Sequence, residues 1–234
     1  MGVCFICGGF GKPGGCPKCH KDSTKIVVPK GKEDKFIKDI SFKQVPLDYV
    51  GTVWNKDLLL ANHPELDKDL RFKDYANMLD KIHNKFMSGL VPSASIFISA
   101  KSKMSKCIFA YSCMQYALSK GHSVAPIIDT IELQRLLILS GENPKWKLYN
   151  YINYDDYITS EVLFLTVTKT ERHSWSFPYI QELLDRRSRL NLPTFVISSF
   201  GLKELARDCD ADYDSIVDGS AQLNPFKYPL IIEY

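Results

Sequence analysis

From residue 93 onward, short apolar runs alternate with longer segments in which apolar residues recur every three to four positions. The short runs predict strands and the longer segments predict helices. Apolar strands that alternate with helices indicate a parallel sheet covered by helices on both faces. This part of the sequence therefore predicts an α/β fold, with strands at 95–99, 123–128, 162–167 and 194–199 and helices at 107–120, 130–139 and 175–190.

Residues 56–88 predict helices upstream of the alternating pattern. Three consecutive leucines stand near the start, and apolar side chains recur at helical spacing from Tyr75 to Phe86. Pro64 lies between these two parts, and proline interrupts a helix because it lacks an amide proton. We therefore expect two helices in this segment.

Two Cys-x-x-Cys pairs stand near the N-terminus, Cys4 with Cys7 and Cys16 with Cys19. Each pair forms a knuckle, and two knuckles make a tetrahedral thiolate cage with every position filled, which is typical of structural zinc. In so small a segment the metal would supply the folding energy. A redox Cys-x-x-Cys is the competing interpretation, but it normally comes singly on a βαβ unit. The sequence predicts a zinc ribbon at residues 1–24, suited to docking on a protein or a nucleic acid.

Charge is unevenly distributed along the 234 residues, whose formal net charge is +3. Residues 1–45 hold nine lysines against four acidic residues, a balance of +5 that leaves −2 for the remainder. A basic arm of this kind fits contact with an acidic protein face or with phosphates, or is simply a solvated linker. No apolar run reaches the roughly 18 residues that span a bilayer. Because the N-terminus leads directly into a cysteine motif, we expect no signal peptide and a cytoplasmic location.

The predicted strand, loop and helix at 95–120 stand in the arrangement of a phosphate-binding loop. Aligned to the pattern G-x-x-x-x-G-K-[ST], Ala100 and Ser105 take the glycine positions, Lys106 the lysine position and Cys107 the hydroxyl position. Only the lysine survives. The glycines let the loop turn its amides inward, and the hydroxyl binds magnesium, for which a thiol is a poor ligand. The sequence predicts a degenerate nucleotide site at Ser105, Lys106 and Cys107, and ATP with magnesium is expected to bind weakly or not at all.

Four segments carry a family resemblance through their order. IFISAKSKMSKCIFA is similar to a phosphate-loop segment, SVAPIIDTIELQRLL to the following strand and helix, and VLFLTV to a Walker B strand. WSFPYIQELLDRRSRLNLPTFVISSFGLKEL is similar to the helix, turn and sensor strand that end such a core. Together they resemble the replicative-helicase loaders of bacteria and phages, the DnaC/DnaI type of AAA+ ATPase. Some loaders also have an N-terminal zinc module and a linker. The resemblance implies a P-loop/AAA+-like core and a replicative helicase as partner.

The positions that carry catalysis in this family are changed in a consistent way. The acids expected after the third strand are replaced by Thr166 and Val167. The polar sensor pair is replaced by Ser198, Ser199 and Phe200. The arginine finger is replaced by Asp214 and Ser215. Phosphoryl transfer depends on positioned charges: a lysine, a metal ion, an acid and an arginine. We therefore expect no significant ATP hydrolysis, although weak nucleotide binding through Lys106 is compatible with the sequence.

Three arginines, Arg186, Arg187 and Arg189, cluster at the end of the predicted helix 175–190. They predict a contact to DNA phosphates or to a neighbouring subunit, or simply favourable charge at a helix C-terminus. The aromatic residues of 148–157 are suited to stacking on bases, or else to packing a loop against the core.

These observations predict a phage-type helicase loader or adaptor in DNA replication, with a core that is not an active enzyme. Single-stranded DNA is a second expected partner, and assembly into a homo- or hetero-oligomer fits the same interpretation. The alternatives are an active ATP-dependent loader with an unusual site and an inhibitor that mimics a loader. The expected parts are a zinc module at 1–24, a basic linker at 25–55, a helical segment at 56–92 and the degenerate core at 93–234.

Overall fold

The fold is described from a computed structural model of the chain. It describes residues 2–3, 10–11, 45, 49, 51–62, 68–100, 103–142, 154–167, 177–201, 204 and 230–234. The chain divides into two compact units. One comprises residues 1–92 and 104–126, and the other comprises residues 93–103 and 127–234. The expected boundary at residue 93 is therefore crossed by residues 104–126, which belong with the upstream helices. Among the described residues, no helix combines the length and the apolar character that crossing a membrane requires.

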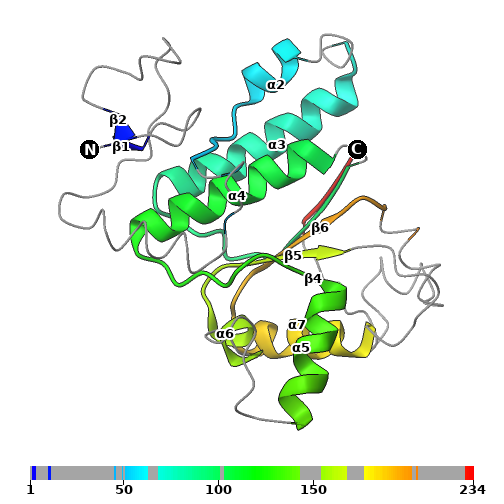
Figure 1. Cartoon of the computed structure of the whole chain (residues 1–234). Helices are drawn as coiled ribbons and strands as arrows, with labels where there is room; N and C mark the ends of the chain where they lie inside the picture. The colour runs from blue at the N-terminus through cyan, green and yellow to red at the C-terminus, as the bar shows by residue number, and fades with distance from the viewer. Residues whose placement is uncertain are drawn as a thin grey trace. The chain divides into compact units, whose positions relative to one another are not determined.

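The second unit is built on a five-stranded parallel sheet in the order β4-β5-β6-β3-β7 (Figure 1). The α/β class and the parallel sheet expected from the sequence are confirmed. Every described side chain of β3 and β6 is buried, which explains why both strands are continuous apolar runs. The strands are β3 (Ile96–Ser99), β4 (Ile128–Asp129), β5 (Leu163–Val167), β6 (Thr194–Ser198) and β7 (Leu230–Glu233).

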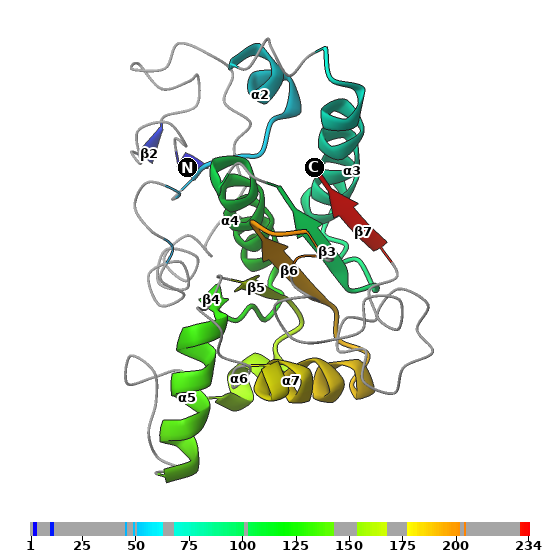
Figure 2. The ribbon, with the colours of Figure 1, turned by 90° about the vertical axis from the view of Figure 1, so that its right-hand side faces the viewer.

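Three helices of this unit lie side by side on one side of the sheet, as both ribbon views show (Figure 2). They are α5 (Thr130–Glu142), α6 (Tyr154–Thr159) and α7 (Phe177–Arg189). Within the sheet, the rings of Phe164 and Phe195 stack with their centroids 4.9 Å apart. The strand expected at 123–128 is limited to its last residue and Asp129, because Pro126 cannot donate a hydrogen bond to a neighbouring strand.

The described part of the first unit consists mainly of helices, with a two-stranded pairing near the N-terminus. Its helices are α2 (Lys56–Asn62), α3 (Leu70–Met87) and α4 (Lys103–Lys120), the last of which belongs to this unit from Met104 onward. The two helices expected around Pro64 are confirmed as α2 and α3. The strands β1 (Gly2–Val3) and β2 (Phe10–Gly11) pair antiparallel, with Val3 opposite Phe10.

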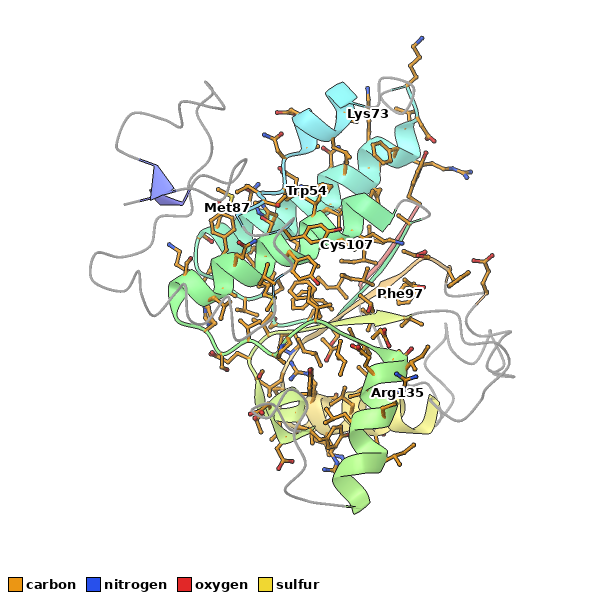
Figure 3. All side chains as sticks on the ribbon, in the orientation of Figure 1. Trp54, Lys73, Met87, Phe97, Cys107 and Arg135 are labelled. Carbon is orange, nitrogen blue, oxygen red and sulfur yellow. The ribbon has the colours of Figure 1, made fainter. Side chains whose placement is uncertain are left out.

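Buried polar side chains tie α3 and α4 to the segment before α2. Nε2 of His83 lies 2.7 Å from Oγ of Ser112, and the same oxygen accepts a 3.0 Å hydrogen bond from the amide of Trp54. The Trp54 ring packs edge-on against Phe109 with centroids 5.7 Å apart. Figure 3 shows Trp54 directed from its segment toward α4. These contacts fix the segment 51–54 on α4, and they explain why Ser112 is fully buried without being an unsatisfied polar group.

Glycines end both long helices of this unit. Gly89 follows α3 with φ of 84° and Gly121 follows α4 with φ of 91°, a backbone conformation that side chains with a Cβ rarely adopt. The next amide in each case bonds back to a carbonyl five residues earlier, at Lys85 and Ala117. The helix end expected at residue 120 is thereby confirmed.

Candidate nucleotide-binding site

The carboxyl ends of β3 and β6 form a topological switch point in the sheet. After β3 the chain continues to β4, on the far side of β5 and β6, whereas after β6 it continues to β7, on the other side of β3. In open parallel sheets, ligands bind outside the carboxyl ends of the strands where the connections diverge in this way. The degenerate phosphate-loop segment leaves β3 at this point, so this edge is the place to look for a nucleotide site.

The connection from β3 to α4 is too short for the expected phosphate loop. β3 ends at Ser99 and α4 begins at Lys103, which leaves residues 100–102 between them. The pattern required a loop from Ala100 to Ser105, whose inward-facing amides would cradle the phosphates. Residues 103–105 are helical instead, so their backbone is not available in a loop conformation. This difference from the sequence expectation follows from the missing glycines, which would have favoured a loop over a helix.

The first residue of this connection is held in the sheet. The amide of Ala100 donates a 3.2 Å hydrogen bond to the carbonyl of Ser198, and Ala100 is only 1% exposed. On the opposite side of β3, the amide of Tyr234 donates to the carbonyl of Ser99 at 2.9 Å. Backbone hydrogen bonding therefore continues at the carboxyl end of β3 on both sides of the strand, and the Ala100 amide is directed toward β6.

Lys106, the surviving residue of the phosphate-loop pattern, lies in the first turn of α4 and is 1% exposed. Cys107 follows it and is half-buried, whereas the side chain of Ser105 lies outside the described residues. A lysine this deeply buried differs from one that reaches out of a loop toward a nucleotide. The expected helix began at residue 107, so the structure extends it upstream and places the lysine within its first turn, away from solvent.

The ends of β5 and β4 carry no carboxylate that points to a metal among the residues described there. Thr166, at the position of the expected acid, donates through Oγ1 to the carbonyl of Ile128 at 3.3 Å. Asp129 ends β4, and its Oδ1 accepts hydrogen bonds of 2.8 Å from the amides of Ile131 and Glu132. Asp129 is therefore the N-cap of α5. Burial raises the pKa of Glu132, and the neighbouring charge of Asp129 raises it further.

Sequence reasoning missed this role of Asp129, although a signal was present. An acidic residue followed three positions later by Glu132 has the spacing of a capping box, which marks a helix start. No comparable signal in the sequence predicts the place of Ser99 at the switch point. That place depends on pairing with a strand residue, Ser198, almost a hundred positions away.

The arginine cluster divides into residues with different environments, and Arg187 requires a correction. Its side chain is 0% exposed, so it is not available for a contact with DNA or with another subunit. Arg186 is exposed but engaged, since it forms an ion pair with Glu182 at 2.5 Å and its guanidinium lies 5.9 Å from the ring centre of Tyr154. Arg189 is exposed. The expectation of a three-arginine surface therefore reduces to Arg186 and Arg189.

Buried hydrogen-bond acceptors explain why Arg187 faces inward. Its guanidinium donates to Oγ1 of Thr194 and to four backbone carbonyls at distances between 2.6 and 3.2 Å, those of Tyr157, Ile158, Ser160 and Pro193. The same burial lowers its pKa to about 10, at which the group still carries its charge near neutral pH. Arginine suits this place because its planar fork presents five donors in a fixed geometry.

The four cysteines of the predicted zinc site lie outside the described residues. Within the ranges described, which do not include these cysteines, no group of three or more metal-ligating side chains gathers. The zinc site remains a prediction, and Cys4, Cys7, Cys16 and Cys19 are the residues that would hold the ion.

The second unit is thus built on a parallel sheet in which the chain leaves β3 at the switch point through the short connection to α4. Solved structures with a similar arrangement include DnaI, with 20% identity, a TM-score of 0.49, and coverage of 71% of this chain and 86% of that one. The DnaC helicase loader is similar with 16% identity, a TM-score of 0.47, and coverage of 71% and 91%. The replication initiator DnaA bound to AMPPCP and single-stranded DNA follows with 12% identity, a TM-score of 0.45, and coverage of 70% and 45%. No protein-family model and no curated protein sequence matches the chain.

Proposed function

We propose that this chain is a loader-type adaptor of DNA replication with an AAA+-like core that does not hydrolyse ATP. In this proposal the zinc module at 1–24 binds a replicative helicase in the cytoplasm. The core scaffolds the resulting assembly and contacts single-stranded DNA. The proposal rests on the ordered resemblance of four segments to the helicase loaders and on the condition of the sheet edge where a nucleotide would bind.

The short connection between β3 and α4 is the observation that carries the non-hydrolysing part. It leaves residues 100–102 in place of a full phosphate loop, and the Ala100 amide is bonded to Ser198. Thr166 stands where an acid would hold the metal, and its hydroxyl bonds to a strand carbonyl. Because phosphoryl transfer is catalysed almost entirely by positioned charges, the loss of several of them removes most of the rate enhancement.

Phosphate release from Mg-ATP by the full-length protein tests this part. We expect a rate at the no-enzyme background, with no difference between the wild type and Lys106→Met or Lys106→Arg. Both variants keep a long side chain in a buried position, so a loss of folding is less of a concern than with alanine. Turnover in the wild type that Lys106→Met abolishes would instead establish an active ATP-dependent loader with an unusual site.

Capture of the replicative helicase from the native host tests the adaptor part. Purified wild-type protein is expected to co-elute with the helicase, and a Cys4→Ser, Cys7→Ser double variant is expected to lose the complex. The matched control is Cys113→Ser, which changes a buried cysteine outside the predicted site. Failure of the wild type to bind, or equal binding by both variants, contradicts the proposed role of the zinc module.

A loader and an inhibitor that mimics one differ in the result of binding. In a helicase-loading reaction with host components, a loader increases the amount of helicase on single-stranded DNA, and an inhibitor decreases it. We expect an increase that does not depend on ATP hydrolysis by this chain, because the core lacks the charges for that reaction.

A further inference from the structure

The turn that follows β6 is held at one residue, Phe200, whose carbonyl is bonded to β3 and whose amide is bonded back to the end of β6. The carbonyl of Phe200 accepts a 3.0 Å hydrogen bond from Oγ of Ser99, and the amide of Phe200 donates a 2.9 Å hydrogen bond to Oγ of Ser198. We name this arrangement the serine clamp: the hydroxyls of Ser99 and Ser198 together with the backbone of Phe200. It joins the carboxyl ends of two neighbouring parallel strands at the switch point.

The clamp is shielded from solvent. Ser99 is 4% exposed and Ser198 is 1% exposed, so neither hydroxyl exchanges its partner for water easily. A serine hydroxyl has one proton to donate, and that of Ser99 is committed to the carbonyl of Phe200. Breaking this bond inside the protein would leave a buried polar group unsatisfied, which is more unfavourable than the bond itself is favourable.

Further bonds fix the residues on either side of the clamp. The carbonyl of Ser198 accepts from the amide of Ala100 at 3.2 Å, which links the same two strands once more. Beyond Phe200, the amide of Gly201 donates to Oε2 of Glu204 at 3.0 Å. The backbone from Ser198 to Gly201 is therefore anchored at four points by residues of its own unit.

We propose that the serine clamp holds the turn after β6 in one conformation that does not depend on a bound nucleotide. In a parallel sheet, the loops at the switch point are the elements that a ligand contacts and can move. Here the side chains of Ser99 and Ser198, which would respond to a ligand at this place, instead hold the turn. This inference deepens the proposed function, because a core without hydrolysis has no need of a nucleotide-responsive turn.

Amide hydrogen exchange of the full-length protein, read residue by residue by NMR, tests the clamp. In the wild type we expect the Phe200 amide to be protected, with a rate that millimolar Mg-ATP or Mg-ADP does not alter. Ser198→Ala removes the acceptor and is expected to raise the Phe200 exchange rate roughly two- to tenfold, the range for one lost hydrogen bond. Ser99→Ala is the second variant and is expected to act in the same direction, while Ser198→Thr restores the hydroxyl and the protection.

Ser188→Ala is the matched control, since Ser188 is an exposed serine on α7. It should leave Phe200 exchange unchanged. Equal exchange in Ser198→Ala and Ser188→Ala, or a change in the wild type on adding Mg-ATP, would overturn the clamp. The two proposals fail separately: loss of helicase capture with intact protection contradicts the adaptor role alone, and nucleotide-dependent exchange with intact capture contradicts the clamp alone.

Discussion

The guanidinium of Arg187 donates a 2.8 Å hydrogen bond to the backbone carbonyl of Ser160, the residue that follows α6. Two further bonds from the same nitrogen reach the carbonyls of Tyr157 and Ile158 in the last turn of that helix. A cation is favourable at this place because the helix C-terminus carries a partial negative charge and unpaired carbonyls. One side chain of α7 thereby completes the end of α6, a helix too short to be stable alone.

Replacement of Arg187 is expected to destabilise the protein strongly. Arg187→Met leaves several buried carbonyls without donors, and we expect a loss of about 3 kcal/mol or more in the free energy of unfolding. Arg187→Lys should recover little of this, because an ammonium group cannot reproduce the planar fork. Urea denaturation measures the loss, with the exposed Arg189→Ala as control, which should change stability by less than about 0.5 kcal/mol. A similar small effect for both residues would contradict the structural role of Arg187.

The buried His83 makes stability depend on pH. Burial lowers its pKa to about 4 from the ordinary value of 6.5. Between these values the unfolded chain binds a proton that the folded protein does not, so stability is complete above pH 6.5 and falls as the pH is lowered toward 4. From pH 7 to pH 5 this group alone should remove about 2 kcal/mol of unfolding free energy.

Urea denaturation of the wild type and of His83→Gln at pH 7, 6 and 5 isolates this contribution. The variant loses the titrating group, so its stability should fall less steeply between pH 7 and pH 5. Parallel curves for the two proteins would show that His83 is not held neutral by burial.

Two helix ends offer opposite predictions from the same backbone conformation. Gly121 has φ of 91° and open space where a Cβ would stand, so Gly121→Ala tests backbone strain alone and should destabilise by about 1 kcal/mol. Asn191, after α7, has φ of 56°, and Asn191→Gly should stabilise by a few tenths of a kcal/mol up to about 1 kcal/mol. Thermal unfolding of both variants gives the sign, and a stabilised Gly121→Ala would refute the assignment.

Metal content checks the N-terminal prediction independently of any partner. Protein purified without added metal should contain about one zinc ion per chain, and Cys16→Ser should lose most of it. Cys113→Ser, outside the predicted site, should keep the wild-type content. An unchanged zinc content in Cys16→Ser would exclude the four-thiolate cage.

The sequence predicted the strands β3, β5 and β6 to within one residue at each end, because each is an apolar run with both faces buried. It did not predict β7 (Leu230–Glu233), whose four residues form a strand through pairing with β3, more than a hundred positions earlier. It also left the aromatic stretch 148–157 either to stack on bases or to pack a loop against the core, and it predicted no helix there. The buried side of α6, a short helix, is formed by Tyr154, Tyr157 and Ile158. The end of this helix is completed by Arg187, which is not a local neighbour in the sequence.

At the candidate site, the sequence predicted a strand followed by a helix but not the backbone conformation between them. Lys106 was expected in the loop before a helix that begins at residue 107, whereas α4 begins at Lys103 and Lys106 lies buried in its first turn. Pattern matching assumes the loop conformation that the motif has elsewhere, and without glycines the chain takes up helix earlier. For Arg187, periodicity identified a helix end but could not tell which of three clustered arginines faces inward, since the acceptors come from two separate segments, 157–160 and 193–194.

The division of the chain into two discontinuous units bears on which fragments can be studied. Because α4 belongs with the upstream helices, a fragment that starts at residue 93 would keep Ser112 and Phe109 but lack His83 and Trp54, the residues that cover them. Such a fragment would expose an apolar helix face and aggregate, and its inactivity would say nothing about the sheet. Deletion of residues 1–24 removes neither the contact between His83 and Ser112 nor the one between Trp54 and Phe109. In this shorter form, an effect on helicase capture can therefore be measured separately from an effect on core stability.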